Sequence, residues 1–257
     1  MPAPKKRILL SVAGFLYFFV KLVPWKLKRW LLTAFLVIET RGDSRGALIK
    51  LLQIEDKLSW VINERAMQYG ENMHPKHRLT QYHHFFIQNI PSGASILDVG
   101  CGKGVVAYEI AKHLPACSVT GVDRNSERYS EANKRNDLSN LSFILSDVCK
   151  EPLRGDFNVI ILSNVLEHIE KRVDFLKALI SNVSPDLFLI RVPAFERDWK
   201  MPLRKELGVN YYSDEEHYIE HKLEELEGEV EEAGLIIESQ ETKWGEIWMK
   251  CGTHDRT

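Results

Sequence analysis

The stretch from Ile96 to Ile110 reads ILDVGCGKGVVAYEI: an apolar run, three glycines at alternate positions, and then a second apolar run. This pattern predicts a strand that passes through a tight loop into a helix. Glycine has no Cβ, so such a loop can turn sharply and its backbone can come close to a ligand. We therefore predict a ligand-binding loop built on Gly100, Gly102 and Gly104.

The glycine spacing differs from that of two common phosphate-binding loops. The dinucleotide pattern G-x-G-x-x-G needs a glycine where this chain has Val105, and a P-loop ending in GK[ST] is absent because Gly104 follows Lys103. The remaining pattern, D-x-G-x-G-x-G, has Asp98 two residues before the first glycine. A carboxylate there suits a cationic ligand group or its bridging water, and it is poorly placed beside a pyrophosphate.

Around this loop, short apolar runs alternate with helix-like segments, which predicts a doubly wound parallel sheet covered by helices on both faces. Two last runs, joined by only a few residues, must pair antiparallel. We therefore predict an α/β fold with a Rossmann-like seven-stranded sheet, an antiparallel last strand and an N-terminal helical extension. The expected strands are SILDVG, CSVTGVD, LSFILSD, FNVIILSN, LFLIRV, GLIIES and WGEIWMKC, and the expected helices are 105–114, 125–136, 172–183 and 218–233.

Polar side chains stand at the carboxyl ends of the next three expected strands. Ligands of parallel sheets bind at this edge. For a ligand that contains a nucleoside and an amino-acid part, Asp123 can accept hydrogen bonds from the two ribose hydroxyls. Asp147 can accept one from the adenine amino group, beside Val148, and Asn164 is expected beneath the amino-acid end. Taken singly, each acid is more readily explained as a helix N-cap or a solvated turn residue, and it is the set of four polar groups at successive strand ends that indicates a ligand.

The segments ILDVGCGKG, VTGVD, LSD and FNVIILSNVLEHI, in this order, resemble the motifs of class I S-adenosylmethionine-dependent methyltransferases. The resemblance covers residues 95–192, and the terminal hairpin fits the reversed seventh strand of that family. It implies the cofactor S-adenosyl-L-methionine, with its methionine part near Asp98 and the glycine loop, its ribose at Asp123 and its adenine at Asp147. Residues 191–248 more faintly resemble methyltransferases of cell-surface polysaccharide synthesis. The predicted cofactor-binding residues are Asp98, Gly100, Cys101, Gly102, Gly104, Asp123, Arg124, Asp147, Val148 and Asn164.

Methyl transfer to a hydroxyl needs a base for the acceptor proton. His168 follows the fourth strand and is the predicted base, with Glu167 orienting it or binding substrate. His168 can alternatively cap the next helix or pack under the cofactor. His217 is the third catalytic candidate and, with His221, is expected to share one helix face. That pair has no third metal ligand, so no metal is predicted.

Two further segments are candidates for the acceptor side. Residues 72–86, NMHPKHRLTQYHHFF, hold four histidines with Lys76 and Arg78, and can form a lid that meets a phosphate or a sugar acid. The alternative is a polar helix start with His84 packed against the sheet. The insertion at residues 193–217 places Trp199 among basic side chains, which suits a sugar or phosphate, although loop and rim charge explains it almost as well. These side chains are Arg191, Arg197, Arg204 and Lys205.

The N-terminus is a separate zone. Residues 1–38 hold seven basic residues and no acidic one, whereas the rest of the chain has 27 Lys and Arg against 36 Asp and Glu. Basic clusters flank two apolar runs, Ile8–Val20 and Trp30–Ile38, both short of the roughly 20 residues of a membrane span. A signal peptide, a single span and a buried helix pair are alternatives. We favour an in-plane or re-entrant anchor on an anionic cytoplasmic leaflet.

These features predict a membrane-associating segment (1–40), a helical lid or extension (41–90) and a methyltransferase domain (91–257) at the cytoplasmic face of the membrane. Four widely spaced cysteines agree with a reducing compartment. The expected reaction is O-methylation of a saccharide or lipid-linked intermediate. A small lipid or quinone acceptor is the nearest rival, and a non-catalytic scaffold is the alternative of another class. Nucleic acid is not expected as a partner, because the catalytic part is acidic and SNVL stands where an NPPY-like tetrapeptide would follow the fourth strand.

Overall fold

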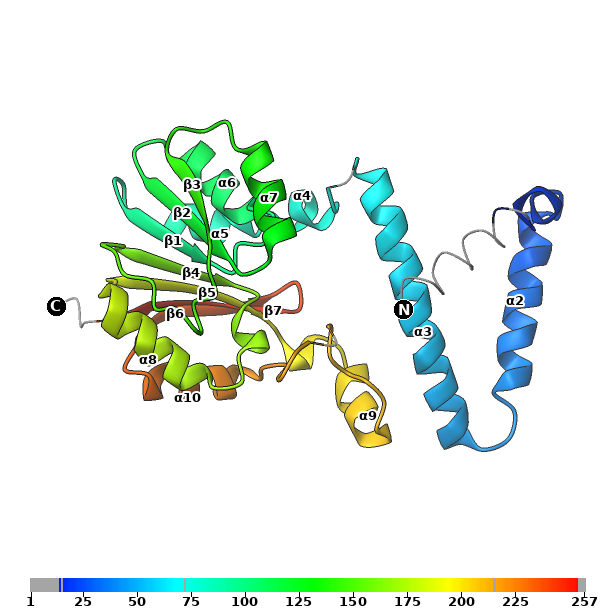
Figure 1. Cartoon of the computed structure of the whole chain (residues 1–257). Coiled ribbons are helices and arrows are strands. Elements are labelled where there is room, and N and C mark those ends of the chain that lie inside the picture. Colours follow the sequence, from blue (N-terminus) through cyan, green and yellow to red (C-terminus); the bar gives the residue numbers. More distant parts are fainter. Residues whose placement is uncertain (1–13, 15, 72, 215, 254–257) are drawn as a thin grey trace. The chain divides into compact units, whose positions relative to one another are not determined.

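The computed structural model describes residues 14, 16–71, 73–214 and 216–253. The chain divides into two compact units, one ending at Ile62 and the other beginning at Asn63 (Figure 1). The first unit contains α2 (Trp25–Glu39) and most of α3 (Ser44–Tyr69). The basic residues Lys5, Lys6 and Arg7 and most of the apolar run Ile8–Val20 lie outside the described residues.

The second unit is built on a seven-stranded sheet in the order β3-β2-β1-β4-β5-β7-β6. The first five strands are parallel, and β7 runs antiparallel to both β5 and β6, so the predicted fold is confirmed. The strands are β1 (Ser95–Val99), β2 (Ser118–Asp123), β3 (Leu141–Leu145), β4 (Val159–Ser163), β5 (Leu187–Pro193), β6 (Ile236–Lys243) and β7 (Glu246–Gly252).

Helices cover both faces of the sheet, because the central strands carry apolar side chains on each face. One core layer joins Leu162 and Phe188 to α8 and α10, and the other joins Ile161 and Leu189 to α5 and α6 (Figure 1). Each fully buried aliphatic side chain contributes about 1.5–3 kcal/mol relative to exposure. The helices and short 3₁₀ turns of this unit are α4 (Lys76–Thr80), α5 (His83–Asn89), α6 (Val105–His113), α7 (Ser126–Arg135), η1 (Leu166–His168), α8 (Arg172–Val183), η2 (Phe195–Arg197), α9 (Lys200–Leu207) and α10 (Leu223–Glu232).

The last predicted helix begins later than expected, at Leu223 rather than near Tyr218. The Glu220 carboxylate accepts hydrogen bonds from the backbone N–H and hydroxyl of Ser213 and contacts the His217 ring, and such side-chain bonds hold the segment out of a helix. His221 instead forms an isolated β-bridge with Ala194. The prediction that His217 and His221 share a helix face is therefore wrong.

Two other expectations about the flanking segments can be compared with the structure. Residues 44–90 are mainly helical, as predicted, in α3, α4 and α5. Within α5, however, His83 is buried and His84 is exposed, so His84 does not pack against the sheet. The insertion expected at 193–217 contains the short helix α9.

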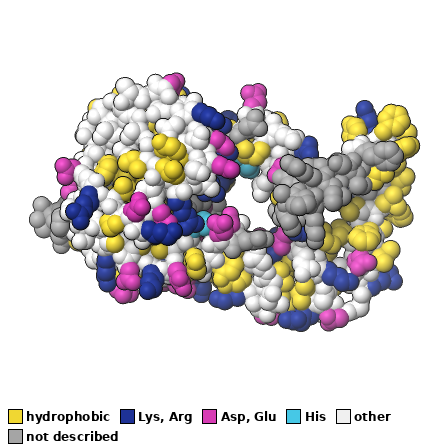
Figure 2. Space-filling model, in the orientation of Figure 1, with side chains coloured by type: hydrophobic (Ala, Val, Ile, Leu, Met, Phe, Trp, Pro, Cys, Tyr) yellow, Lys and Arg dark blue, Asp and Glu magenta, His cyan; other side chains and the backbone are white. Residues whose placement is uncertain are grey.

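Helix α2, in the first unit, leaves most of its apolar side chains exposed. Helix α2 has no buried residue, and Trp25, Trp30 and Phe35 are each more than half exposed. Figure 2 shows hydrophobic side chains along this helix. Within the described residues, none of the helices combines the length and apolar character that crossing a membrane requires.

Candidate active site

A cavity of about 340 Å³ opens at the carboxyl ends of β1, β2 and β4. Parallel strands all end at this edge, which is where the fold collects side chains that are distant in sequence. Its size falls at the lower end of the usual range of roughly 300–1,000 Å³ for ligand pockets. Of the predicted site residues, it is lined by Gly100, Asp123, Arg124, Asp147, Val148, Asn164 and His168.

Two loop positions require glycine for steric reasons. Gly100 and Gly104 have φ values of 67° and 74°, in the left-handed region. A Cβ on Gly100 would stand 2.9 Å from Val165 Cγ2, and one on Gly104 would stand 2.5 Å from Phe143 Cζ. The loop can therefore pack this closely between the strand ends only with glycine at both positions.

Asp98 lies beneath the loop and does not line the cavity itself. Its carboxyl group is buried, accepts a hydrogen bond from the backbone of Ala107 in α6, and leaves Oδ2 without a partner among the described residues. Burial raises the pKa of Asp98 to about 7, and the charge of Asp123 adds to the shift. An orphaned carboxylate oxygen under the loop fits a ligand that brings a cationic group.

Asp123 joins the end of β2 to the glycine loop. Its Oδ2 accepts a hydrogen bond from the Gly102 N–H at 2.8 Å, and its Oδ1 accepts one from the Asn125 N–H at 2.7 Å. The N-cap of α7 is Asn125, not Asp123. Each carboxylate oxygen has a second lone pair, so Asp123 can hold the loop and still accept hydrogen bonds from two hydroxyls in the cavity.

At the ends of β3 and β4 the two polar residues are held differently. Asp147 is half-buried and pairs with Lys150 at 3.1 Å. Asn164 has a φ of 58°, and it is fixed in this left-handed conformation from both sides by Arg191. The Asn164 N–H donates to the Arg191 carbonyl at 2.8 Å, and Arg191 Nε donates to Asn164 Oδ1 at 3.2 Å.

Arg191 is a positioning residue that the sequence interpretation assigned to the rim of the insertion. It is buried, its guanidinium carbon lies 3.8 Å from the centre of the Tyr82 ring, and Nε lies 3.4 Å from Glu246 Oε2. The sequence does contain a sign of this role: Arg191 is the single charged residue in the otherwise apolar strand LFLIRV, and a buried arginine needs partners. Arg197 and Arg204 are likewise used inside the fold: Arg197 pairs with Glu220, and Arg204 donates to the Asn210 carbonyl.

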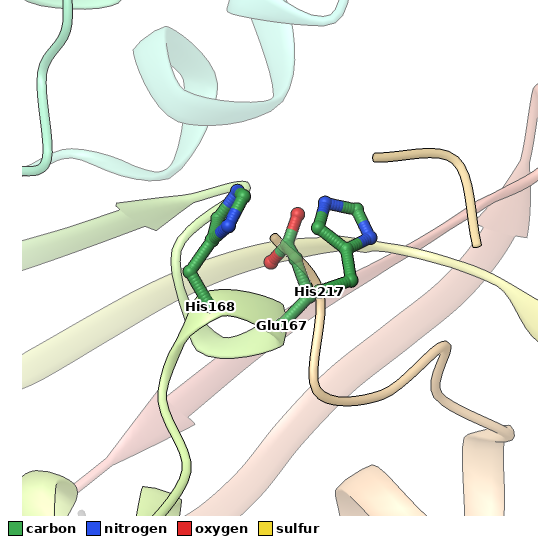
Figure 3. Close-up of side chains that lie close together, drawn as sticks. All are labelled: Glu167, His168 and His217. Carbon is green, nitrogen blue, oxygen red and sulfur yellow. The ribbon is translucent and has the colours of Figure 1, made fainter. Parts of the chain in front are cut away.

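Glu167, His168 and His217 converge beside the cavity, and Figure 3 shows the carboxylate between the two imidazole rings. The 3₁₀ turn η1 carries the first two, and residues 213–222 bring in His217. The two rings meet edge to face, with centres 4.5 Å apart. The structure thus brings together all three predicted catalytic residues, whereas His221 lies apart, against Glu229 at 3.2 Å.

The three side chains have different electrostatic surroundings. Burial raises the pKa of Glu167 to about 7, and neither carboxylate oxygen accepts a hydrogen bond from another described residue. Burial and the charge of His217 lower the pKa of His168, so that its ring is neutral near pH 7. Burial acts to lower the pKa of His217, but the hydrogen bond with Glu220 and the charges of Glu167, Glu220 and Asp214 together outweigh burial, and the pKa is raised.

The sequence profile of the family described as "Methyltransferase domain" matches residues 69–240, and the chain belongs to this family. The sheet order and the reversed β7 are those of S-adenosylmethionine-dependent methyltransferases, and S-adenosylmethionine is the cofactor of the family. The orphaned Asp98 oxygen, the glycine loop and Asp123 fit that cofactor, whose amino group is cationic and whose ribose carries two hydroxyls.

Individual curated relatives match only part of the chain. The mitochondrial ubiquinone biosynthesis O-methyltransferase of Schizosaccharomyces pombe is 35% identical over 104 residues, which are 38% of this chain and 37% of that protein. Pavine N-methyltransferase of Thalictrum flavum subsp. glaucum is 35% identical over 91 residues, 34% of this chain and 26% of that protein. The chain thus spans between about a quarter and two fifths of the length of these curated relatives. The magnesium protoporphyrin IX methyltransferase of Synechocystis, solved with bound S-adenosylhomocysteine, shares the fold with a TM-score of 0.52 at 15% identity, over 86% of this chain and 95% of that one.

Proposed function

We propose that this protein is an S-adenosylmethionine-dependent O-methyltransferase whose acceptor is the hydroxyl of a saccharide or lipid-linked intermediate at a membrane surface. One observation carries the proposal: the cavity has Asp123 and the glycine loop on one side and His168, with Glu167 and His217 behind it, on another. Donor-binding groups and groups that can manage a proton therefore border the same space.

On the donor side, Asp98 and the loop from Gly100 to Gly104 would hold the methionine part, Asp123 the ribose, and Asp147 with Val148 the adenine. When bound, the cofactor supplies an electrophilic methyl group on a sulfonium centre. The task of these residues is to fix that end of the reaction in place, since in-line transfer requires reacting atoms held about 3–3.5 Å apart.

On the acceptor side, a neutral His168 facing the cavity suits an acceptor hydroxyl that has to lose its proton as the new bond forms. An amine that is already neutral attacks through its lone pair and needs no base in the transfer step, whereas a hydroxyl is a weak nucleophile until its proton is removed. The proposed oxygen specificity rests on this difference, since matched relatives include both an O- and an N-methyltransferase by name.

Membrane contact is supported by the composition and exposure of α2. Exposed Trp25, Trp30 and Phe35 share this helix with Lys26, Lys28 and Arg29, and a helix of that kind lies in the interface of an anionic bilayer. Each basic residue contributes about 1 kcal/mol to such binding. Replacing all three by glutamine should therefore weaken binding to phosphatidylserine vesicles by roughly 100-fold, and equal sedimentation of both proteins with these vesicles would refute the contact.

A small lipid or quinone acceptor is the second candidate. It is favoured by the Schizosaccharomyces pombe relative, which is named for ubiquinone biosynthesis, and by the internal contacts of Arg197 and Arg204, which leave fewer side chains of the insertion for a sugar. Trp199, 73% exposed, remains available to stack on a sugar ring. The two candidates differ in the chemistry of the methylated product, so one assay separates them.

The test uses the full chain, S-adenosylmethionine with a labelled methyl group, and total lipid extract in vesicles as acceptor. Label in the lipid phase that mild acid releases as a sugar ether supports the first acceptor class, and label that stays on an aromatic ring supports the second. Calorimetry with S-adenosylmethionine runs beside it. Binding with no transfer to any lipid, saccharide or quinone fraction would favour the non-catalytic scaffold, and absence of binding would overturn the proposed activity itself.

A further inference from the structure

We propose that Glu167, His168 and His217 bind a divalent transition-metal ion, and that this ion holds the acceptor oxygen beside the methyl donor. One ligand atom from each side chain lies within 4.8 Å of the other two (Figure 3). The role given to the ion rests on the proposed function, but the metal site itself does not.

Glu167 gives the first argument. Its side chain is completely buried, and both carboxylate oxygens lack a hydrogen-bond donor from any other described residue. Burying a carboxylate without a partner is costly, so such a group in a native fold normally pairs with a cation. The neighbours that it faces are the two imidazoles, which are metal ligands when neutral.

The second argument is that both imidazoles are held by further contacts, as metal-bound histidines usually are. His217 Nδ1 lies 3.0 Å from Glu220 Oε1, which leaves its other ring nitrogen available. Glu220 is itself buried and fixed by Arg197 and Ser213. The ring of His168 is hydrogen-bonded to the backbone of Glu216. These contacts set the orientation of each ring.

The ligand chemistry selects the kind of ion. Two imidazoles and one carboxylate suit Zn²⁺, Mn²⁺ or Fe²⁺, whereas Mg²⁺ and Ca²⁺ prefer oxygen ligands alone. With metal–ligand distances of about 2.0–2.2 Å, the ligand atoms would sit roughly 3–3.5 Å apart, so small side-chain rotations complete the set. Three protein ligands leave at least one position open.

The open position gives the site a role in the reaction. His168 lines the cavity, so an ion beside it would face the acceptor. A hydroxyl bound to a divalent ion loses its proton to water more readily than a free one, and the resulting oxygen attacks the methyl carbon while the carbon–sulfur electron pair stays on sulfur. In this arrangement His168 is a metal ligand instead of the base, and solvent water accepts the proton.

The test measures metal binding without any methyl transfer. Full-length protein is stripped with a chelator and titrated with ZnCl₂ or MnCl₂ by calorimetry, and CoCl₂ is added separately to record its visible absorption. We expect one ion per chain, and at least tenfold weaker binding in Glu167→Gln and His217→Ala. Glu220 is not a ligand but contacts the ligand His217, as well as Ser213 and Arg197, so Glu220→Gln should weaken metal binding by roughly 10–100-fold. His113→Ala is the matched control, because His113 is an exposed histidine near the carboxylate of Glu109.

The outcomes separate this proposal from the proposed function. Zn²⁺ or Mn²⁺ affinity that falls in the ligand variants but not in His113→Ala supports the site even if no acceptor is methylated. Absence of saturable binding, or equal affinity in all variants, overturns it, and chelator-resistant methyl transfer would then leave His168 as the base. Glu167→Gln keeps the size of the side chain and removes a buried charge, so circular dichroism and S-adenosylmethionine affinity should match wild type.

Discussion

Replacing Asp123 by asparagine tests how one carboxylate serves two purposes. Both of its oxygens accept backbone N–H bonds, from Gly102 at 2.8 Å and from Asn125 at 2.7 Å. An asparagine has only one acceptor oxygen, so its NH₂ group must face one of these N–H donors. Leaving a fully buried N–H unpaired costs about 1–3 kcal/mol, and because these two hydrogen bonds are only partly buried the free energy of unfolding should fall by no more than that amount.

The same substitution should weaken cofactor binding. A hydrogen bond from a ribose hydroxyl to a charged acceptor contributes about 1.5–3 kcal/mol, and losing one such bond corresponds to roughly a 10- to 150-fold loss of affinity. Calorimetry with S-adenosylmethionine measures the affinity, and urea unfolding measures the stability. Asp156→Asn removes a charge from an exposed position and serves as control. Affinity within twofold of wild type in Asp123→Asn would refute the assignment of the ribose to this residue.

Two further predictions concern stability. Gly104→Ala should destabilise the protein by roughly 1–3 kcal/mol, because the new Cβ meets Phe143 and the residue must keep a positive φ. Gly228→Ala should instead stabilise it by about 0.5–1 kcal/mol, because Gly228 is at an exposed position of α10 where an added Cβ meets nothing beyond its own helix. Changes of the same sign for both variants in urea unfolding would contradict this. Burial lowers the pKa of His83 to about 4, below its ordinary 6.5, so its contribution to stability is complete above pH 6.5 and is lost as the pH falls towards 4. Between pH 7.5 and pH 5, the free energy of unfolding of His83→Phe should therefore fall by roughly 2 kcal/mol less than that of wild type. His84→Phe, at the exposed neighbouring position, should follow wild type. Parallel plots of unfolding free energy against pH for all three proteins would show that His83 does not titrate in this way.

The parts of the fold that the sequence predicts well are those in which local pattern and burial agree. Leu97 and Val99 belong to one core layer and Ile96 to the other, so the strand is apolar throughout and its glycine-rich end is conspicuous. The helix expected at 172–183 is found at Arg172–Val183. In such segments nothing from a distant part of the chain competes with the local preference.

The acceptor side was harder to predict because long-range contacts decide it. The sequence of residues 213–222 contains a helix-like run of acids and histidines. In the structure, however, the Glu220 carboxylate contacts Ser213, His217 and Arg197 and holds the described residues 213–214 and 216–222 out of a helix. His217 is thereby brought to Glu167, a residue far away in sequence. The spacing of residues in the sequence does not predict a contact between side chains so far apart along the chain. The structure does point to it, because a buried carboxylate such as that of Glu167 needs a polar or cationic partner.

The two sides of the cavity therefore have different structural origins. The proposed donor side is formed by the ends of β1, β2 and β4, whose positions follow from the sheet. The proposed acceptor side depends on η1 and on an irregular segment held by the buried carboxylate of Glu220. Because an irregular segment can change without disturbing the sheet, one donor site can serve many acceptors. This division explains why relatives named for oxygen and for nitrogen acceptors both match this chain. It also directs the search for acceptor specificity to the residues around Glu220 rather than to the glycine loop.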